Sequence, residues 1–190
     1  YRIVSQFLQD KASSSVAVLD PSKLTKEQKE IRQKTHLSLQ KITDDVSRRH
    51  SFNTAIAMLM ELSNLLNKFN LTDGQSMAIR AETIDIILKS LSPFTPHICH
   101  KLWLDLGHKD AIINELWPVI DMQALKQDEI QIVVQVNGKL RAKITVDANA
   151  KNNEIESIAL VDENVVKFVE GKNIVKTIVV PNKLVNIVAR

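Results

Sequence analysis

Hydrophobic residues in the first part of the chain recur every three or four positions, which is the spacing of one face of an α-helix. From Lys23 to about Leu106 this pattern forms four consecutive stripes. The stripes consist of Ile31, Leu39, Ile42 and Val46; of Phe52, Ala55, Ile56, Leu59, Met60, Ser63 and Leu66; of Met77, Ala81, Ile84, Leu88 and Leu91; and of Ile98, Leu102 and Leu106. The pattern predicts an antiparallel helical bundle.

Turn-forming residues separate the stripes. One turn falls at Leu71–Gly74, and Ser92–Pro96 ends one helix and starts the next, with Thr95 as the cap and Pro96 in the first helical position. The chain opens without Met on a further helical face formed by Ile3, Val4, Phe7 and Leu8. We therefore expect it to be a fragment of a longer protein that begins inside a helix.

After Pro118 the period of the hydrophobic pattern changes to two, which indicates strands. The expected elements are strands around Ile130–Val134 and Leu140–Val146, a helical stretch Asn152–Glu170 interrupted near Asp162 and ended by Gly171, and strands Ile174–Val180 and Leu184–Val188 hinged at Pro181 and Asn182. This order is a β-β-α-β-β module. The fold class is therefore α+β, with a helical domain at 1–122 and a small α+β domain at 123–190.

The hairpin between the first two strands admits two registers. A two-residue turn at 137–138 would place Arg141 opposite Val134 and bring charge onto the apolar face. A three-residue loop at 136–138 would place Leu140 there instead and keep that face apolar, because a slip of one residue turns every side chain over. The pattern therefore favours the three-residue, bulge-type loop.

In that register the second strand acquires a cationic face. The polar side chains expected to share the solvent side, beside an exposed tip at Asn137, are Gln135, Lys139, Arg141 and Lys143. Such a face serves either solubility or contact with RNA phosphates, and spacing does not decide between the two.

Composition narrows the function classes. The 190 residues carry 25 basic and 22 acidic side chains, a net charge of +3, so that any affinity for nucleic acid must come from local patches. The lone Cys99 excludes an intramolecular disulfide and is typical of a reducing compartment. We expect no membrane segment, because no apolar run of about 18 residues occurs.

Few residues suggest catalysis or metal binding. His97 and His100 flank Cys99, but one metal site needs three or four converging ligands, so we interpret them as ordinary helix residues. We find no nucleophile triad and no Gly-rich phosphate loop, and therefore expect no catalytic residue and no metal site.

A basic stripe lies along the first long helix. Lys34, Lys41 and Arg48 are spaced by seven, and Arg49 extends the stripe. Ion pairs of Asp44 with Arg48 and of Asp45 with Arg49, each four residues apart, would make it an ordinary solvated helix face. The same stripe could contact RNA backbone.

Several segments together resemble one family. The segments KTHLSLQKITDDVSRRHSFNTAIAMLMELSN (34–64) and LKSLSPFTPHICHKLW (88–103), followed by ELWP (115–118), resemble the helical anticodon-binding domain of class I aminoacyl-tRNA synthetases. The segments VVQVNGKLRAKITV (133–146), EGK (170–172) and VVPNKLVNIV (179–188) resemble the C-terminal domain of bacterial-type leucyl-tRNA synthetases. The resemblance covers the chain from about Thr25 onward.

This resemblance implies a tRNA-binding part of an enzyme that joins leucine to its tRNA with ATP. ATP and Mg would belong to catalytic and editing domains upstream, and this fragment would need no cofactor of its own. The parent would be a cytoplasmic monomer. The implied nucleic-acid-binding residues are Lys34, Lys41, Arg48, Arg49, Asn137, Lys139, Arg141, Lys143, Lys172 and Lys183, and a polar tether at 119–129 could be a hinge.

Two alternatives stay open. The bundle also suits a valyl- or isoleucyl-type synthetase, although neither the heptads nor the paired cysteines typical of the ends of those enzymes occur. The small domain could instead be a protein-interaction module. An exposed apolar patch on it, in place of a basic one, would favour that interpretation.

Overall fold

The structure is a computed structural model that describes residues 1–126, 129–148, 150–180 and 183–190. It divides into two compact units, Tyr1–Lys126 and Gln127–Arg190, so the division falls four residues beyond the expected position. The predicted hinge at Pro181 and Asn182 lies outside the described residues. Within the described ranges, no helix is both long and apolar enough to cross a membrane.

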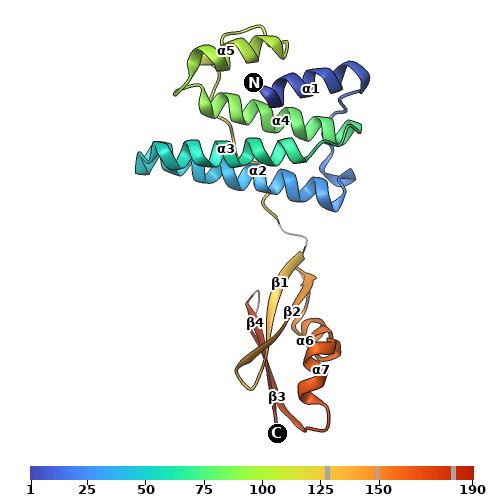
Figure 1. Ribbon diagram of the computed structural model, residues 1–190. Coiled ribbons are helices and arrows are strands. Elements are labelled where there is room, and N and C mark those ends of the chain that lie inside the picture. The colour runs from blue at the N-terminus through green and yellow to red at the C-terminus, as the bar shows by residue number, and fades with distance from the viewer. Residues whose placement is uncertain (127–128, 149, 181–182) are drawn as a thin grey trace. The chain divides into compact units, whose positions relative to one another are not determined.

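The first unit is a helical bundle (Figure 1). Its elements are α1 (Arg2–Ser13), η1 (Pro21–Lys23), α2 (Lys26–Asp44), a π-helical turn η2 (Asp45–Arg49), α3 (Phe52–Lys68), α4 (Gly74–Leu91), α5 (Pro96–Asp105) and η3 (Ile112–Asn114). Local chemistry sets these boundaries. Thr25 and Gln28 form a reciprocal capping box at the start of α2, and Asp73 accepts hydrogen bonds from the first turn of α4.

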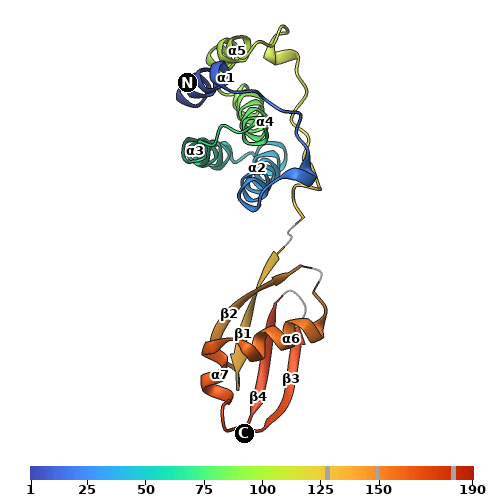
Figure 2. The same ribbon diagram turned by 90° about the vertical axis from the view of Figure 1, so that its right-hand side faces the viewer.

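Helix α4 is the centre of the bundle. Figure 2, which views the bundle nearly end-on, shows it between α1, α2, α3 and α5. Because it has neighbours on every side, even its polar Ser76, Thr83 and Ser90 are buried. The hydroxyl of Thr83 lies 3.1 Å from that of Thr35 on α2, which satisfies both groups.

Two of the predicted helix faces were partly wrong. On α3 the buried residues are Ala55, Leu59, Leu62 and Leu66, whereas Met60 is 63% exposed. On α5 the buried residues are Cys99, Leu102 and Trp103, whereas Ile98 is exposed. Both stretches contain more apolar residues than one face can bury, so the side that is buried depends on the neighbouring helices. Pro96 takes the first helical position as predicted, but the Thr95 side chain does not cap the helix.

The second unit is a four-stranded sheet with two helices on one face (Figure 2). Its elements are β1 (Glu129–Val136), β2 (Lys139–Asp147), α6 (Asn152–Val161), α7 (Glu163–Val169), β3 (Ile174–Val180) and β4 (Leu184–Ala189). The strand order is β2-β1-β4-β3, with β1 and β4 parallel and the outer pairs antiparallel. The predicted α+β class and the β-β-α-β-β order are confirmed, with the helical stretch divided at Asp162.

The two units have separate hydrophobic cores. The main core of the bundle includes Leu62, Met77 and Trp103. The second unit buries side chains of β1, β2 and β4 under Ile155, Ala159 and Val165 of the two helices.

The predicted hairpin loop is wrong. Asn137 and Gly138 form a two-residue turn, both with positive φ (50° and 76°), and Val136 pairs with Lys139. The register then shifts, because Arg141 has no partner between the pairs Gln135–Leu140 and Val134–Ala142. This β-bulge restores the apolar register that the longer loop was expected to provide.

Candidate nucleic-acid interface

The bundle presents the predicted basic stripe on α2 and η2. Lys34, Lys41, Arg48 and Arg49 are all exposed. The predicted acidic partners are present: Arg48 Nε lies 2.6 Å from Asp44, and Arg49 lies 3.2 Å from Asp44 and 3.6 Å from Asp45. The hydrogen bond from Arg48 holds the pKa of Asp44 below its usual range.

The arginines and the lysines of the stripe therefore differ in how far their charge is neutralised. Its two arginines are partly neutralised by neighbouring carboxylates, and exposed pairs of this kind contribute little to stability. Lys34 and Lys41 have no acidic partner in the part of the chain that the structure describes. These two lysines are the members of the stripe whose charge is available to an anion.

The predicted cationic face of the second unit does not form. Lys139 lies opposite Val136, which is buried in the core, and cross-strand partners share one face of a sheet. The bulge turns Arg141 to the helix side as well, where its Cζ lies 3.7 Å from the ring centroid of Phe168. Of the three cations only Lys143 keeps the expected position on the open face, as does the polar Gln135.

The open face carries Lys143 and Lys176, but the rest of it includes many apolar side chains where the sequence predicted charge. Leu140 is 56% exposed there, and Ile178 and Val180 of β3 are 40% and 37% exposed. The further partly exposed apolar residues on this face are Val133, Leu184 and Val188. This distribution has the kind of apolar surface expected of a protein-interaction module.

Asn137 has a structural role. Its side-chain Nδ2 donates to Ala189 O at 2.8 Å, and its side-chain Oδ1 accepts from Ala189 N at 3.0 Å. The turn is further joined to β4 through Gly138 N, which donates to Asn186 Oδ1. The Asn137 side chain is therefore occupied and is not offered to a ligand.

The remaining two candidates lie at different places in the second unit. Lys172 follows α7 and donates from Nζ to Phe168 O at 3.0 Å, which brings it to the same residue as Arg141. Lys183 is exposed at the start of β4, and its carbonyl accepts from Val133, the residue paired with Lys143. Arg141 and Lys172 thus both contact Phe168, whereas the backbones of Lys143 and Lys183 adjoin Val133 on either side of β1.

Phe168 was not among the site residues predicted from the sequence. The sequence shows an aromatic residue at this position, but the contact of Phe168 with Arg141 depends on the β-bulge at Arg141. The bulge was not predicted there, because we expected a three-residue loop in place of the two-residue turn.

The predicted tether at 119–129 is partly fixed to the bundle. Trp117 Nε1 donates to Thr43 Oγ1, Arg32 pairs with Asp121 at 2.7 Å, and Gln33 Nε2 donates to Leu125 O at 3.3 Å. These contacts hold residues 117–125 along α2. The rest of the predicted tether includes residues 127–128, which lie outside the described residues.

Comparison with known proteins assigns the chain to a family. The family described as "Anticodon-binding domain of tRNA ligase" matches residues 28–158, from α2 into α6. The chain belongs to this family. The family match extends past Lys126, so it includes the β1–β2 hairpin as well as the bundle.

The chain is also similar to individual proteins named leucine–tRNA ligase. The chain is 55% identical over its whole length to "Leucine--tRNA ligase" of Ruthia magnifica subsp. Calyptogena magnifica, and 45% identical over its whole length to that of Histophilus somni (strain 2336). It spans only 23% and 22% of these relatives, about a quarter of their length.

The chain is also similar in structure to part of a solved protein. The chain superimposes over its whole length on 24% of a chain in the "Crystal structure of the ternary complex of Agrobacterium radiobacter K84 agnB2 LeuRS-tRNA-LeuAMS", with a TM-score of 0.75 and 30% sequence identity.

Proposed function

We propose that this chain is the tRNA-binding part of a leucine–tRNA ligase, the enzyme that attaches leucine to its tRNA with ATP. The observation that carries the proposal is the similarity over the whole chain to leucine–tRNA ligases, at up to 55% identity. The leucine relatives favour this specificity over the valyl- and isoleucyl-type alternatives.

In the proposed enzyme, ATP and Mg serve catalytic and editing domains outside this chain, and the chain itself holds RNA. The full enzyme is proposed to be a cytoplasmic monomer. The proposed phosphate contacts are Lys34, Lys41, Arg48 and Arg49 on the bundle and Lys139, Arg141, Lys143, Lys172 and Lys183 on the second unit. Contacts to phosphate fix position without reading sequence, which suits RNA helices whose base edges are hard to reach.

Two weak binding surfaces on one chain also reinforce each other. Once one unit holds the tRNA, the other binds at a raised effective concentration. The affinity of the whole chain should therefore exceed that of either unit.

The test is binding of the chain to leucine tRNA and to a tRNA without a long variable arm, across a salt series from 50 to 200 mM. We expect tighter binding to the leucine tRNA and an affinity for both tRNAs that falls as the salt concentration rises, because each phosphate contact releases counterions. Replacing Lys34 and Lys41 by Gln should weaken binding of both tRNAs and reduce the slope by about two. Equal affinity for the two tRNAs at every salt concentration would contradict leucine specificity.

The apolar open face of the second unit favours a second candidate function, a protein-interaction module. In that case the chain should show no salt-dependent binding of tRNA, and substitution of Leu140 and Ile178 by Ser should reduce capture of a protein partner.

A further inference from the structure

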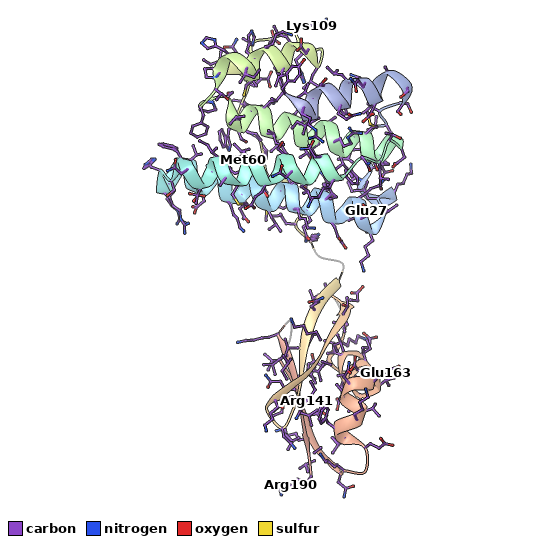
Figure 3. All side chains as sticks on the ribbon, viewed as in Figure 1. Glu27, Met60, Lys109, Arg141, Glu163 and Arg190 are labelled. Atoms are coloured by element: carbon purple, nitrogen blue, oxygen red, sulfur yellow. The ribbon has the colours of Figure 1, made fainter. Side chains whose placement is uncertain are left out.

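Two cationic side chains converge on Phe168. The guanidinium of Arg141 is stacked on its ring at 3.7 Å, and the ammonium of Lys172 is bonded to its carbonyl at 3.0 Å. Phe168 itself is partly buried and packs against the core of the second unit. The ring is thus a fixed platform for Arg141, and Figure 3 shows Arg141 on the side of the sheet that carries α7.

Arg141 differs from the arginines paired with acids elsewhere in the chain. Arg32, Arg48, Arg49 and Arg80 all contact carboxylates. In the described parts of the chain, Arg141 has no acidic partner, and its buried Nε has no hydrogen-bond partner. The protein therefore orders this guanidinium by stacking and leaves its charge uncompensated.

This arrangement determines which ligand group the site suits. With one face of the guanidinium covered, its N–H groups are directed along the plane, which matches the two oxygens of a phosphate. The nearby ammonium of Lys172 adds a second positive charge without any directional demand. An anion with several oxygens therefore matches the chemistry of both groups.

We propose that Arg141 is a pre-oriented clamp for a backbone phosphate of the bound RNA, with Lys172 as a second contact and Phe168 as the positioning residue. This inference rests on the proposed function and specifies it. In addition to Lys143 on the open sheet face, it assigns the second unit a defined RNA contact between β2 and the end of α7.

The structure also explains why a phosphate is favoured over a base. Recognition of a guanine edge would use the same planar donors, but it needs a base that is accessible and does not call for a second cation. Two positive groups around Phe168 suit a charged ligand, and the phosphates are the exposed part of an RNA helix.

The test uses the whole chain and leucine tRNA across the same salt series. Arg141→Gln should weaken binding roughly tenfold and reduce the salt slope by about one, since one phosphate contact is lost. Arg141→Lys keeps the charge but not the planar fork, so affinity should fall several-fold while the slope stays near the wild-type value.

Phe168 is tested by its own pair of variants. Phe168→Leu should reproduce the affinity loss of Arg141→Lys with an unchanged salt slope. Phe168→Tyr, which keeps the aromatic ring, should retain wild-type affinity. The matched control is Lys176→Gln, which removes one exposed positive charge from β3 at the opposite edge of the sheet and should leave the slope and affinity close to wild type.

Two results would overturn the inference: wild-type affinity in Arg141→Lys, or an equal loss in Arg141→Gln and Lys176→Gln. If Phe168→Leu does not fold, the Arg141 variants decide alone. Failure of the wild-type chain to bind leucine tRNA at 50 mM salt would instead refute the proposed function, which separates the two outcomes.

Discussion

At the scale of single residues, the most informative group is the carboxylate of Glu82. It accepts hydrogen bonds from Arg32 at 2.9 Å and from His36 at 3.2 Å. The backbone N–H of Asp121 donates to His36 Nδ1, so the proton of the neutral ring lies on Nε2, facing Glu82. Burial alone would raise the pKa of Glu82, yet the bonds from His36 and Arg32 and the charge of Arg32 outweigh it and hold that pKa below its ordinary value.

This cluster predicts a pH dependence of stability. Because the pKa of Glu82 is lower in the folded state, its contribution is fully present above the unfolded value of about 4.3 and is lost as the pH falls through the folded pKa. In Glu82→Gln, the free energy of unfolding at pH 7 should fall by about 1.5–3 kcal/mol, the range for hydrogen bonds to a charged group. Urea unfolding from pH 7 to pH 3 measures both effects.

The comparison of the two proteins isolates Glu82 from other carboxylates. The difference in unfolding free energy between wild type and Glu82→Gln should shrink as the pH falls below about 4. A difference that stays constant down to pH 3 would show that the carboxylate is not the stabilising form.

At the scale of elements, the β1–β2 hairpin depends on one side chain. Asn137 adopts a left-handed conformation that costs most residues about 1–2 kcal/mol, and it joins the turn to Ala189 by two hydrogen bonds. The turn therefore ties β2 and β1 to the end of β4, and the bulge at Arg141 adjusts the register just beyond it.

Asn137→Ala should lower the unfolding free energy of the second unit by about 2–4 kcal/mol, the sum of strain and lost hydrogen bonds. Asn137→Gly removes only the side-chain bonds, because Gly accepts positive φ, so it should cost about half as much. Thermal unfolding followed by circular dichroism gives both values. Equal losses in the two variants would mean that backbone strain plays no part.

At the scale of the whole molecule, the separate cores make the two units independent in stability. Leu62 is 1% exposed in the bundle core, and Ile187 is fully buried in the second unit. No residue of one core belongs to the other among those that the structure describes.

Two unfolding transitions should therefore be visible by calorimetry. Leu62→Ala should destabilise only the bundle and Ile187→Ala only the second unit, each by about 2–5 kcal/mol. Met60→Ala, on the exposed side of the same helix as Leu62, should change stability by less than about 0.5 kcal/mol. A shift of both transitions in one core variant would contradict this independence.

Much of the fold followed from the sequence, because periodicity is a local property of the chain. The helices at 26–44, 52–68 and 74–91 and the strands at 139–147 and 184–189 lie where periods of 3.6 and 2 placed them. The turn at Gly138 and the break at Asp162 also carried their own signals, a residue that tolerates positive φ and a helix cap.

The tertiary structure decided which faces those elements bury and which cations are brought together. Met60 or Leu62 could each have faced the core, and the packing of α3 against α2 and α4 selects Leu62. Likewise, the alternation of Lys139, Arg141 and Lys143 predicted one cationic face, but the bulge places Arg141 on Phe168. Bulges and helix orientation are set by contacts between residues distant in sequence, so the spacing of one segment could not reveal them.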